Sequence, residues 1–177
     1  MNDPEWPVIE TAVEYETGWY DGGYDLVEQP DGSEKRYYWA DLPPAVVVVA
    51  IDDGDVIFVE QYRPTVKETC LELPAGIVED GEEYESAARR ELAEETGFRA
   101  GSVDTIQRVD VGTGVLRHER GIVVARDLRP GEARLEENEF LSRTRIQASD
   151  ALAAARKQPA NDATLEGILL AQADGYL

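Results

Sequence analysis

The chain has 177 residues, a length typical of one domain with a full hydrophobic core, and it carries 37 acidic against 17 basic residues. The net charge of −20 argues against a nucleic-acid-binding protein, because such proteins need a cationic surface. No stretch approaches 18 apolar residues and no apolar run follows N-terminal basic residues, so we expect neither a secreted nor a membrane-spanning protein.

The first 44 residues are expected to form a β-hairpin segment. Apolar residues alternate loosely between glycines over residues 8–28, a pattern typical of short strands. The turn at 30–33 then leads into a second strand, Lys35–Trp39, and the sequence Leu-Pro-Pro at 42–44 ends it. We therefore divide the chain into an N-terminal segment, 1–44, and a main domain, 45–177.

The main domain begins with two strands and ends with two helices. Ala45–Ile51 reads AVVVVAI and predicts a buried strand, and Val56–Gln61 predicts its partner. Later strands are expected at Ser102–Val111, Gly121–Ala125 and Arg143–Gln147, and helices at Asp150–Lys157 and Asp162–Gln172, with Ser149 and Asn161 as N-caps. This order predicts an α+β fold, or a sheet between helices.

The stretch Gly76–Phe98 carries the strongest chemical signal. Residues 83–96 contain no glycine or proline and are rich in Ala, Glu, Arg and Leu, which predicts a helix that ends at Gly97. Carboxylates at 91, 94 and 95 then share one helix face, where each pair repels by roughly 2–3 kcal/mol at about 6 Å. A bound Mg²⁺ or Mn²⁺ would remove that repulsion. The alternative is a solvated acidic helix.

This stretch resembles the Nudix box, GX5EX7REUXEEXGU with U apolar, at every fixed position. The matching residues are Gly76, Glu82, Arg90, Glu91, Leu92, Glu94, Glu95, Gly97 and Phe98. The resemblance implies an α/β/α sandwich around a mixed β-sheet. It also implies a metal-dependent hydrolase of a nucleoside diphosphate linked to a further group.

Segments beside the box resemble the ADP-ribose pyrophosphatase branch: QYRP at 61–64, ELPAG at 72–76 and the acidic run at 136–139. This resemblance implies that Glu91, Glu95 and the Ala75 carbonyl bind metal. It implies further roles for other residues: Glu94 as a third or water-mediated ligand, Arg90 orienting the glutamates, Arg63 contacting a phosphate or terminal sugar, and Glu137 as general base with Glu139 as the alternative.

One position departs from that branch. A proline usually stands about sixteen residues past the second glycine of the box, followed by a glycine and a glutamate, whereas this chain has Thr113 and then Gly114. The glutamate position falls near His118. We consider that His118 contacts substrate phosphate or is a solvated loop histidine.

Aromatic residues are concentrated in the N-terminal segment. Trp19, Tyr20, Tyr38 and Trp39 lie on a hairpin too small to bury them by itself. They either stack on a nucleotide base or fill the interface of a homodimer, and the resemblance implies such a dimer.

Two features of composition bear on the environment. Lysine occurs only at Lys35, Lys67 and Lys157, and acidic residues are spread along the chain, which favours adaptation to high salt over an ordinary acidic protein. The single cysteine, Cys70, excludes an internal disulfide and fits the reducing cytoplasm. We expect Cys70 to be a small buried residue and not a nucleophile.

Together these observations predict a Mg²⁺- or Mn²⁺-dependent Nudix pyrophosphatase that cleaves a nucleoside diphosphate sugar. ADP-ribose, giving AMP and ribose 5-phosphate, is the expected substrate. A GDP-mannose-type or other nucleoside diphosphate derivative is the alternative within the enzyme class. A non-catalytic Nudix domain that senses a nucleotide sugar is the alternative outside it.

Overall fold

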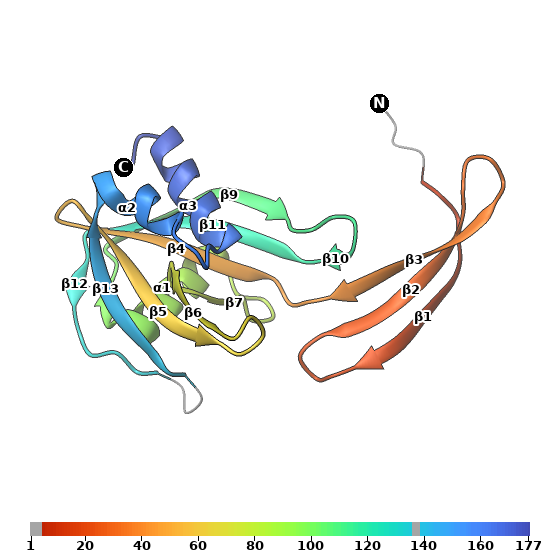
Figure 1. Cartoon of the computed structure of the whole chain (residues 1–177), viewed down its shortest axis with the longest axis horizontal. Helices are drawn as coiled ribbons and strands as arrows, with labels where there is room; N and C mark the ends of the chain where they lie inside the picture. The colour runs from red at the N-terminus through yellow and green to blue at the C-terminus, as the bar shows by residue number, and fades with distance from the viewer. Residues whose placement is uncertain (1–4, 136–138) are drawn as a thin grey trace. The chain divides into compact units, whose positions relative to one another are not determined.

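A computed structural model of the chain describes residues 5–135 and 139–177. The strands are β1 (Val8–Glu16), β2 (Asp21–Glu28), β3 (Glu34–Asp41), β4 (Ala45–Asp52), β5 (Asp55–Arg63), β6 (Glu68–Glu72), β7 (Ala75–Ile77), β8 (Phe98–Arg99), β9 (Ser102–Asp110), β10 (Leu116–Arg117), β11 (Glu119–Arg126), β12 (Arg129–Pro130) and β13 (Leu141–Gln147). The helices are α1 (Tyr84–Thr96), α2 (Ala148–Ala155) and α3 (Asp162–Ala173), as Figure 1 labels them. No helix in the described ranges is long and apolar enough to cross a membrane.

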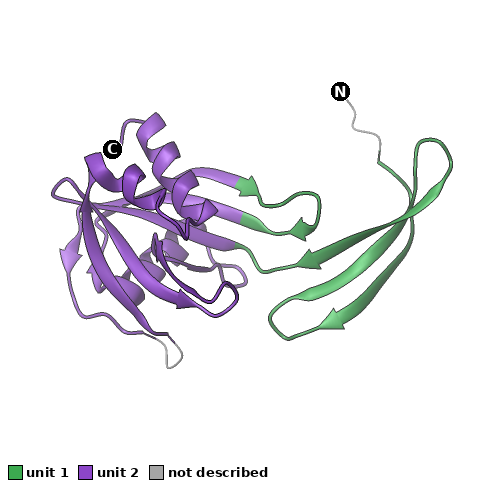
Figure 2. Cartoon of the chain, viewed as in Figure 1, with its two compact units in different colours: residues 1–44, 109–119 green, residues 45–108, 120–177 purple. Residues whose placement is uncertain are grey.

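The chain divides into two compact units, coloured separately in Figure 2. Unit 1 comprises residues 1–44 and 109–119, and unit 2 comprises residues 45–108 and 120–177. The sequence-based division left 109–119 in the main domain. In the structure this segment groups with unit 1, because β10 pairs in parallel with β3.

Unit 2 is built on a mixed sheet that has seven strands in the part of the chain described. β4 lies at its centre, parallel to β11 and antiparallel to β5. Successive valines of β4 point to opposite faces: Val46 and Val48 pack in one core with Leu92 of α1, and Val47 and Val49 pack in a second with Ile168 of α3. Helix α1 therefore covers one face and α2 and α3 the other, as Figure 1 shows, which confirms the expected α/β/α sandwich.

Most predicted elements of unit 2 are present within a few residues, and the two predicted N-caps have different outcomes. Asn161 caps α3, because its Oδ1 accepts a hydrogen bond of 2.9 Å from the Thr164 amide. Ser149 as the cap of α2 is wrong. That helix already begins at Ala148, directly after β13, and its N-cap residue, Gln147, makes no side-chain capping bond. Cys70 is buried, as expected.

Unit 1 contains a sheet in the order β1-β2-β3-β10. β1 pairs antiparallel with β2, and β2 with β3. Many of its large apolar residues are exposed to solvent: Trp6, Val8, Ile9, Val13, Tyr15, Trp19, Tyr37 and Tyr38. The sheet of unit 1 therefore leaves apolar surface uncovered within the chain itself.

Candidate active site

The box stretch forms β7, a loop, helix α1 and β8, and its two glycines have defined structural roles. Gly97 ends the helix with a left-handed backbone of φ 75°, and its amide donates to the Ala93 carbonyl at 3.0 Å. Gly76 lies directly against Glu91: a Cβ at this position would stand 1.9 Å from the Glu91 carboxyl carbon. Any side chain at Gly76 would therefore displace the Glu91 carboxylate.

Arg90 joins several carboxylates of the box. Its Nη1 donates to Glu91 at 2.6 Å and to Glu94 at 3.3 Å, and its Nη2 donates to Glu82 at 2.9 Å and to the Ile77 carbonyl at 2.8 Å. The hydrogen bond from Arg90 holds the pKa of Glu82 below its usual value. The hydrogen bonds expected between Arg90 and the box glutamates are thus present, and they tie the loop before α1 to the helix.

Glu91 and Glu95 are buried, with only 8% and 7% of their surface exposed. Burial raises the pKa of Glu95 to about 8, although a hydrogen bond of 3.2 Å from the Ala75 amide opposes the rise. Burial likewise raises the pKa of Glu91 against the effect of Arg90. The charge of Glu139 adds to the rise at both groups. Both ionised carboxylates are thus costly in this protein and would be stabilised by a cation.

The donors near Ala75 fit a hard divalent cation. Carboxylate and carbonyl oxygens are the ligands of Mg²⁺ and Mn²⁺, and the absence of a side chain at Gly76 leaves room for the Glu91 carboxylate next to β7. Among the residues that the structure describes, no three His, Cys, Asp or Glu side chains are gathered in a metal-binding arrangement. Arg90 donates a hydrogen bond to one oxygen each of Glu91 and Glu94 in this arrangement.

Arg63, expected to contact substrate, ends strand β5 and is held by a buried carboxylate that the sequence reasoning did not identify. Its Nε donates to both oxygens of Glu72 at 3.2 and 3.0 Å, and its Nη2 donates at 2.5 Å. Glu72 is 4% exposed and also accepts a hydrogen bond of 3.0 Å from Nδ2 of Asn161, the residue that caps α3. The sequence feature that could have identified Glu72 is the alternation of side chains along β6, which places Cys70 and Glu72 on the buried side of the strand.

Because the Arg63 side chain is 43% exposed, it is accessible while its orientation is fixed. Burial lowers the pKa of Arg63, but contact with Glu72 and the charge of Glu95 outweigh that effect and raise it overall. The guanidinium of Arg63 therefore feels the negative charge of the box helix.

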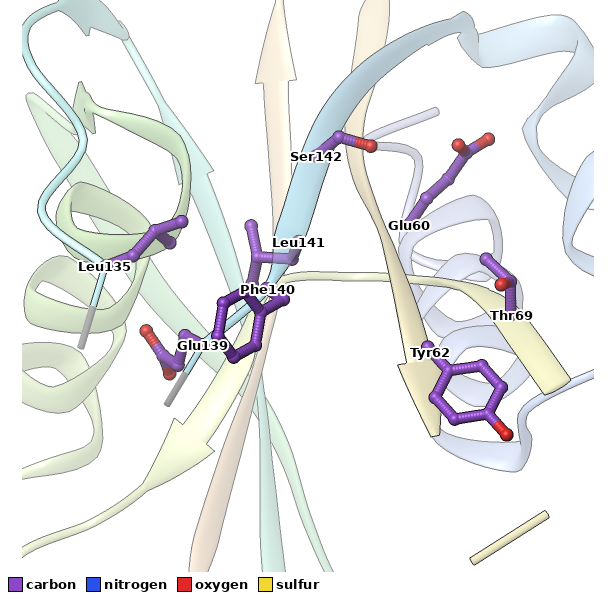
Figure 3. Close-up of a pocket in the computed structure, with 8 residues that line it drawn as sticks. All are labelled: Glu60, Tyr62, Thr69, Leu135, Glu139, Phe140, Leu141 and Ser142. Atoms are coloured by element: carbon purple, nitrogen blue, oxygen red, sulfur yellow. The ribbon is translucent and has the colours of Figure 1, made fainter. Parts of the chain in front are cut away.

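The structure describes only one of the two candidate general bases. Glu137 lies outside the described residues. Glu139 lines an open groove of about 510 Å³ with Leu135, Phe140 and residues of β5, β6 and β13, as Figure 3 shows. The charge of Glu139 raises the pKa of both Glu91 and Glu95, so this carboxylate acts electrostatically on the box.

Comparison with known proteins identifies the family. The family profile described as "NUDIX domain" matches residues 41–166. The chain belongs to the Nudix family. The match covers the whole Nudix box, 76–98, and about 70% of the chain.

Individual relatives are similar over most of the Nudix chain. An ADP-ribose pyrophosphatase of Bacillus subtilis is 34% identical over 140 residues, which is 77% of this chain and 76% of that protein. A methanol dehydrogenase activator of Bacillus methanolicus is 33% identical over 131 residues, 72% of this chain and 71% of that one. A crystal structure of an ADP compounds hydrolase has a TM-score of 0.83 at 22% identity, with 98% of each chain covered, and supports the Nudix fold.

The remaining expected substrate contacts belong to unit 1. Trp19 is 60% exposed and lines an open groove of about 470 Å³ with Pro43 and neighbouring residues. Trp39 is partly buried: its Nε1 donates to Asp25 at 3.2 Å. The Nδ1 of His118 lies 2.8 Å from the Pro43 carbonyl oxygen, so this histidine is a partly buried contact within unit 1 and not a solvated loop residue.

Proposed function

We propose that this Nudix protein is a Mg²⁺-dependent pyrophosphatase that hydrolyses ADP-ribose to AMP and ribose 5-phosphate. The observation that carries the proposal is the burial of Glu91 and Glu95 beside Ala75 within a complete Nudix box. The relative from Bacillus subtilis, an ADP-ribose pyrophosphatase by name, supports this choice of substrate.

In this proposal Glu91, Glu95 and the Ala75 carbonyl hold Mg²⁺ or Mn²⁺, with Glu94 as a third or water-mediated ligand. When bound, the cation would neutralise charge that develops on the diphosphate and lower the pKa of a water molecule. Arg90 keeps the Glu91 and Glu94 side chains close to one another through its own hydrogen bonds. Arg90 therefore shapes the ligand set without contacting substrate.

The remaining steps use residues of the acidic run and of β5. Glu137, or Glu139 as the alternative, takes a proton from the attacking water as that oxygen forms a bond to phosphorus. The bond from this phosphorus to the bridging oxygen breaks, and the departing phosphate keeps the electron pair. Arg63, fixed by Glu72, donates the hydrogen bonds that remain to it to a phosphate or the terminal sugar.

Thr113, where the ADP-ribose pyrophosphatase branch usually has proline, favours a second candidate substrate. A GDP-mannose-type or other nucleoside diphosphate derivative uses the same metal chemistry and differs only in the group beyond the diphosphate. A sensor that binds without cleaving is the third candidate, and the complete set of box glutamates argues against it.

A product assay separates these candidates. The protein is incubated with Mg²⁺ and ADP-ribose, GDP-mannose, UDP-glucose, NADH or Ap₄A in ¹⁸O-labelled water, and products are identified by mass. We expect AMP and ribose 5-phosphate, with the label showing which phosphorus was attacked. Glu95→Gln is the control, and it should lose more than the roughly 10–100-fold that residues behind a metal ligand cost. Binding of ADP-ribose without turnover would support the sensor instead.

We also propose that unit 1 forms the interface of a homodimer. The exposed apolar residues of its sheet, among them Val8, Val13 and Tyr15, supply the surface that a second copy would cover. Trp19 and Trp39 either lie in this interface or stack on the base of the substrate, and His118 is the proposed contact to its phosphate. Light scattering on the eluting protein tests the dimer: a monomer at micromolar concentration would contradict it.

A cytoplasmic location and adaptation to high salt complete the proposal. The single buried cysteine fits a reducing compartment. At a net charge of −20 the acidic side chains repel one another, and salt weakens this repulsion by screening it. We expect the melting temperature to rise between 0.05 M and about 1–2 M KCl. A flat or falling melting temperature over this range would remove the proposal of salt adaptation.

A further inference from the structure

Described residues on the two sides of the acidic segment 135–140 contact the last turn of helix α1. On its upstream side the Arg134 amide donates to the Glu94 carbonyl at 2.9 Å. On its downstream side the Arg143 Nη1 donates to the Thr96 carbonyl at 2.5 Å. The helix turn that carries Glu94 and Glu95 therefore contacts the chain at Arg134 and again at Arg143, four residues after Glu139.

The upstream attachment is a close backbone fit. A Cβ at Gly97 would stand 2.8 Å from both the Gly131 carbonyl oxygen and the Ala133 amide nitrogen. The chain before the acidic segment thus rests directly on the helix end, where no side chain intervenes. This contact depends on backbone atoms and on glycine, so side-chain substitutions elsewhere leave it in place.

The downstream attachment depends on one side chain. Arg143 lies on β13, which is fixed to β5 by the pairing of Arg143 with Val59. Its guanidinium stands over the Phe98 ring at 4.7 Å and reaches the Thr96 carbonyl, one of the last carbonyls of α1. Helix α1 has no basic residue in its own last turn, so Arg143 supplies the positive charge that a helix C-terminus favours.

We propose that Arg143 is a positioning residue, which holds Glu139, four residues upstream, near the box carboxylates by its contact with the end of α1. The inference rests on the proposed function, because it assigns a use to the placement of Glu139, the alternative general base. Arg143 touches neither substrate nor metal in this proposal, and it acts through the helix end and the segment that it joins.

Arg145 provides a matched control on the same strand. It follows two residues later on the same face of β13, and its guanidinium also stands over Phe98, at 5.3 Å. Its ion pairs go to Asp52 and Asp55 instead of to the helix end. Arg143→Met and Arg145→Met therefore remove the same charge and a similar ring contact, but only the first removes the link to α1.

The test compares Arg143→Met, Arg143→Lys and Arg145→Met in the full chain. Hydrogen exchange without metal or substrate should be more than about tenfold faster at the Gly97 and Glu139 amides in Arg143→Met, and close to wild type in Arg145→Met. With ADP-ribose and Mg²⁺, kcat should fall about 10–100-fold in Arg143→Met with KM and Mn²⁺ affinity within about threefold of wild type. Arg143→Lys should recover part of kcat, since an ammonium can donate to the same carbonyl.

The outcomes separate this inference from the proposed function. Equal losses in Arg143→Met and Arg145→Met, or a kcat within threefold of wild type in Arg143→Met, would overturn the positioning role. A wild-type protein that cleaves none of the substrates would overturn the proposed function, while the exchange comparison between the two methionine variants would still decide whether Arg143 fixes the segment.

Discussion

Unit 2 covers its sheet on both faces, whereas unit 1 leaves much of its apolar surface in solvent. In β4 of unit 2, Val46, Val48 and Val49 are fully buried. In β1 of unit 1, Val8 and Val13 are 56% and 51% exposed. Valines of the two units therefore contribute differently to the stability of the fold, because a valine stabilises a fold in proportion to the apolar surface that it buries.

Polar contacts compensate in part for this exposure in unit 1. Asp25 on β2 accepts hydrogen bonds from Thr11 of β1, Trp39 of β3 and Arg117 of β10, at 2.9, 3.2 and 2.5 Å. The Arg117 guanidinium also stands 4.0 Å from the centre of the Trp39 ring. One carboxylate thus joins all strands of the unit 1 sheet that the structure describes.

The two units therefore depend on different interactions. Unit 2 is held by a dry core and can keep the costly buried charges of Glu91 and Glu95, because that core fixes their helix. Among its described residues, unit 1 has a polar cluster around Asp25 and buries few apolar side chains, such as Tyr24 and Val27. We therefore expect substitutions in unit 2 to affect chemistry and stability strongly, and substitutions in unit 1 to act more weakly.

The largest expected effect is on turnover, at the proposed general base. Glu137→Gln should lower kcat about 10²–10⁴-fold, the usual cost of removing such a group, while Mn²⁺ affinity stays near wild type. Steady-state kinetics and Mn²⁺ titration measure the two quantities. A Glu137→Gln enzyme within about threefold of wild type, combined with a strongly impaired Glu139→Gln enzyme, would transfer the role to Glu139.

The next effect is on stability and compares the two units directly. Phe58→Ala removes a fully buried ring of unit 2 and should cost about 3–5 kcal/mol in the free energy of unfolding. Val13→Ala, at a half-exposed position of unit 1, should stay within about 0.5 kcal/mol. Denaturant unfolding of the two variants measures the difference. Similar losses at low protein concentration would contradict the comparison, and would place a core around Val13 in the single chain.

The sequence predicted the sandwich of unit 2 well, because local signals there agree with the tertiary structure. The valine run of β4, the turn before β5 and the glycine after α1 each specify one conformation by themselves. The prediction of Ser149 as a cap was wrong because a serine caps a helix only from the N-cap position. Helix α2 begins at Ala148, directly after β13, so Ser149 lies inside the helix.

The site was predictable only where its residues are close in sequence. The contact of Arg90 with Glu94 follows from helical spacing, because the two residues are four positions apart. The link from Arg143 to Thr96 spans 47 residues, and the contact of Glu72 with Asn161 spans 89. Such contacts depend on the order of the strands in the sheet, and local patterns in a single sequence do not predict that order.

The smallest effect, and the one that most sharpens the comparison, is the pH dependence of unit 1. The pKa of Asp25 is lowered: burial acts to raise it, but hydrogen bonds from Thr11 and Trp39 and the charge of Arg117 outweigh burial. The ionised form therefore binds its neighbours better in the folded state than in the unfolded chain. Its contribution is present above the ordinary aspartate pKa of about 3.9 and is lost as pH falls through the lower folded value.

We expect Asp25→Asn to cost about 1 kcal/mol at pH 7 and to cost progressively less as the pH is lowered from about 4 toward 2, where wild type is itself protonated. Hydrogen exchange at the β2 and β3 amides of unit 1 measures this locally, with β4 amides of unit 2 as an internal reference. Glu14→Gln, on the exposed part of β1, removes the same charge without these contacts and should show no such dependence. A cost that is constant with pH would mean that the geometry of the cluster, and not the charge of Asp25, holds the strands of unit 1 together.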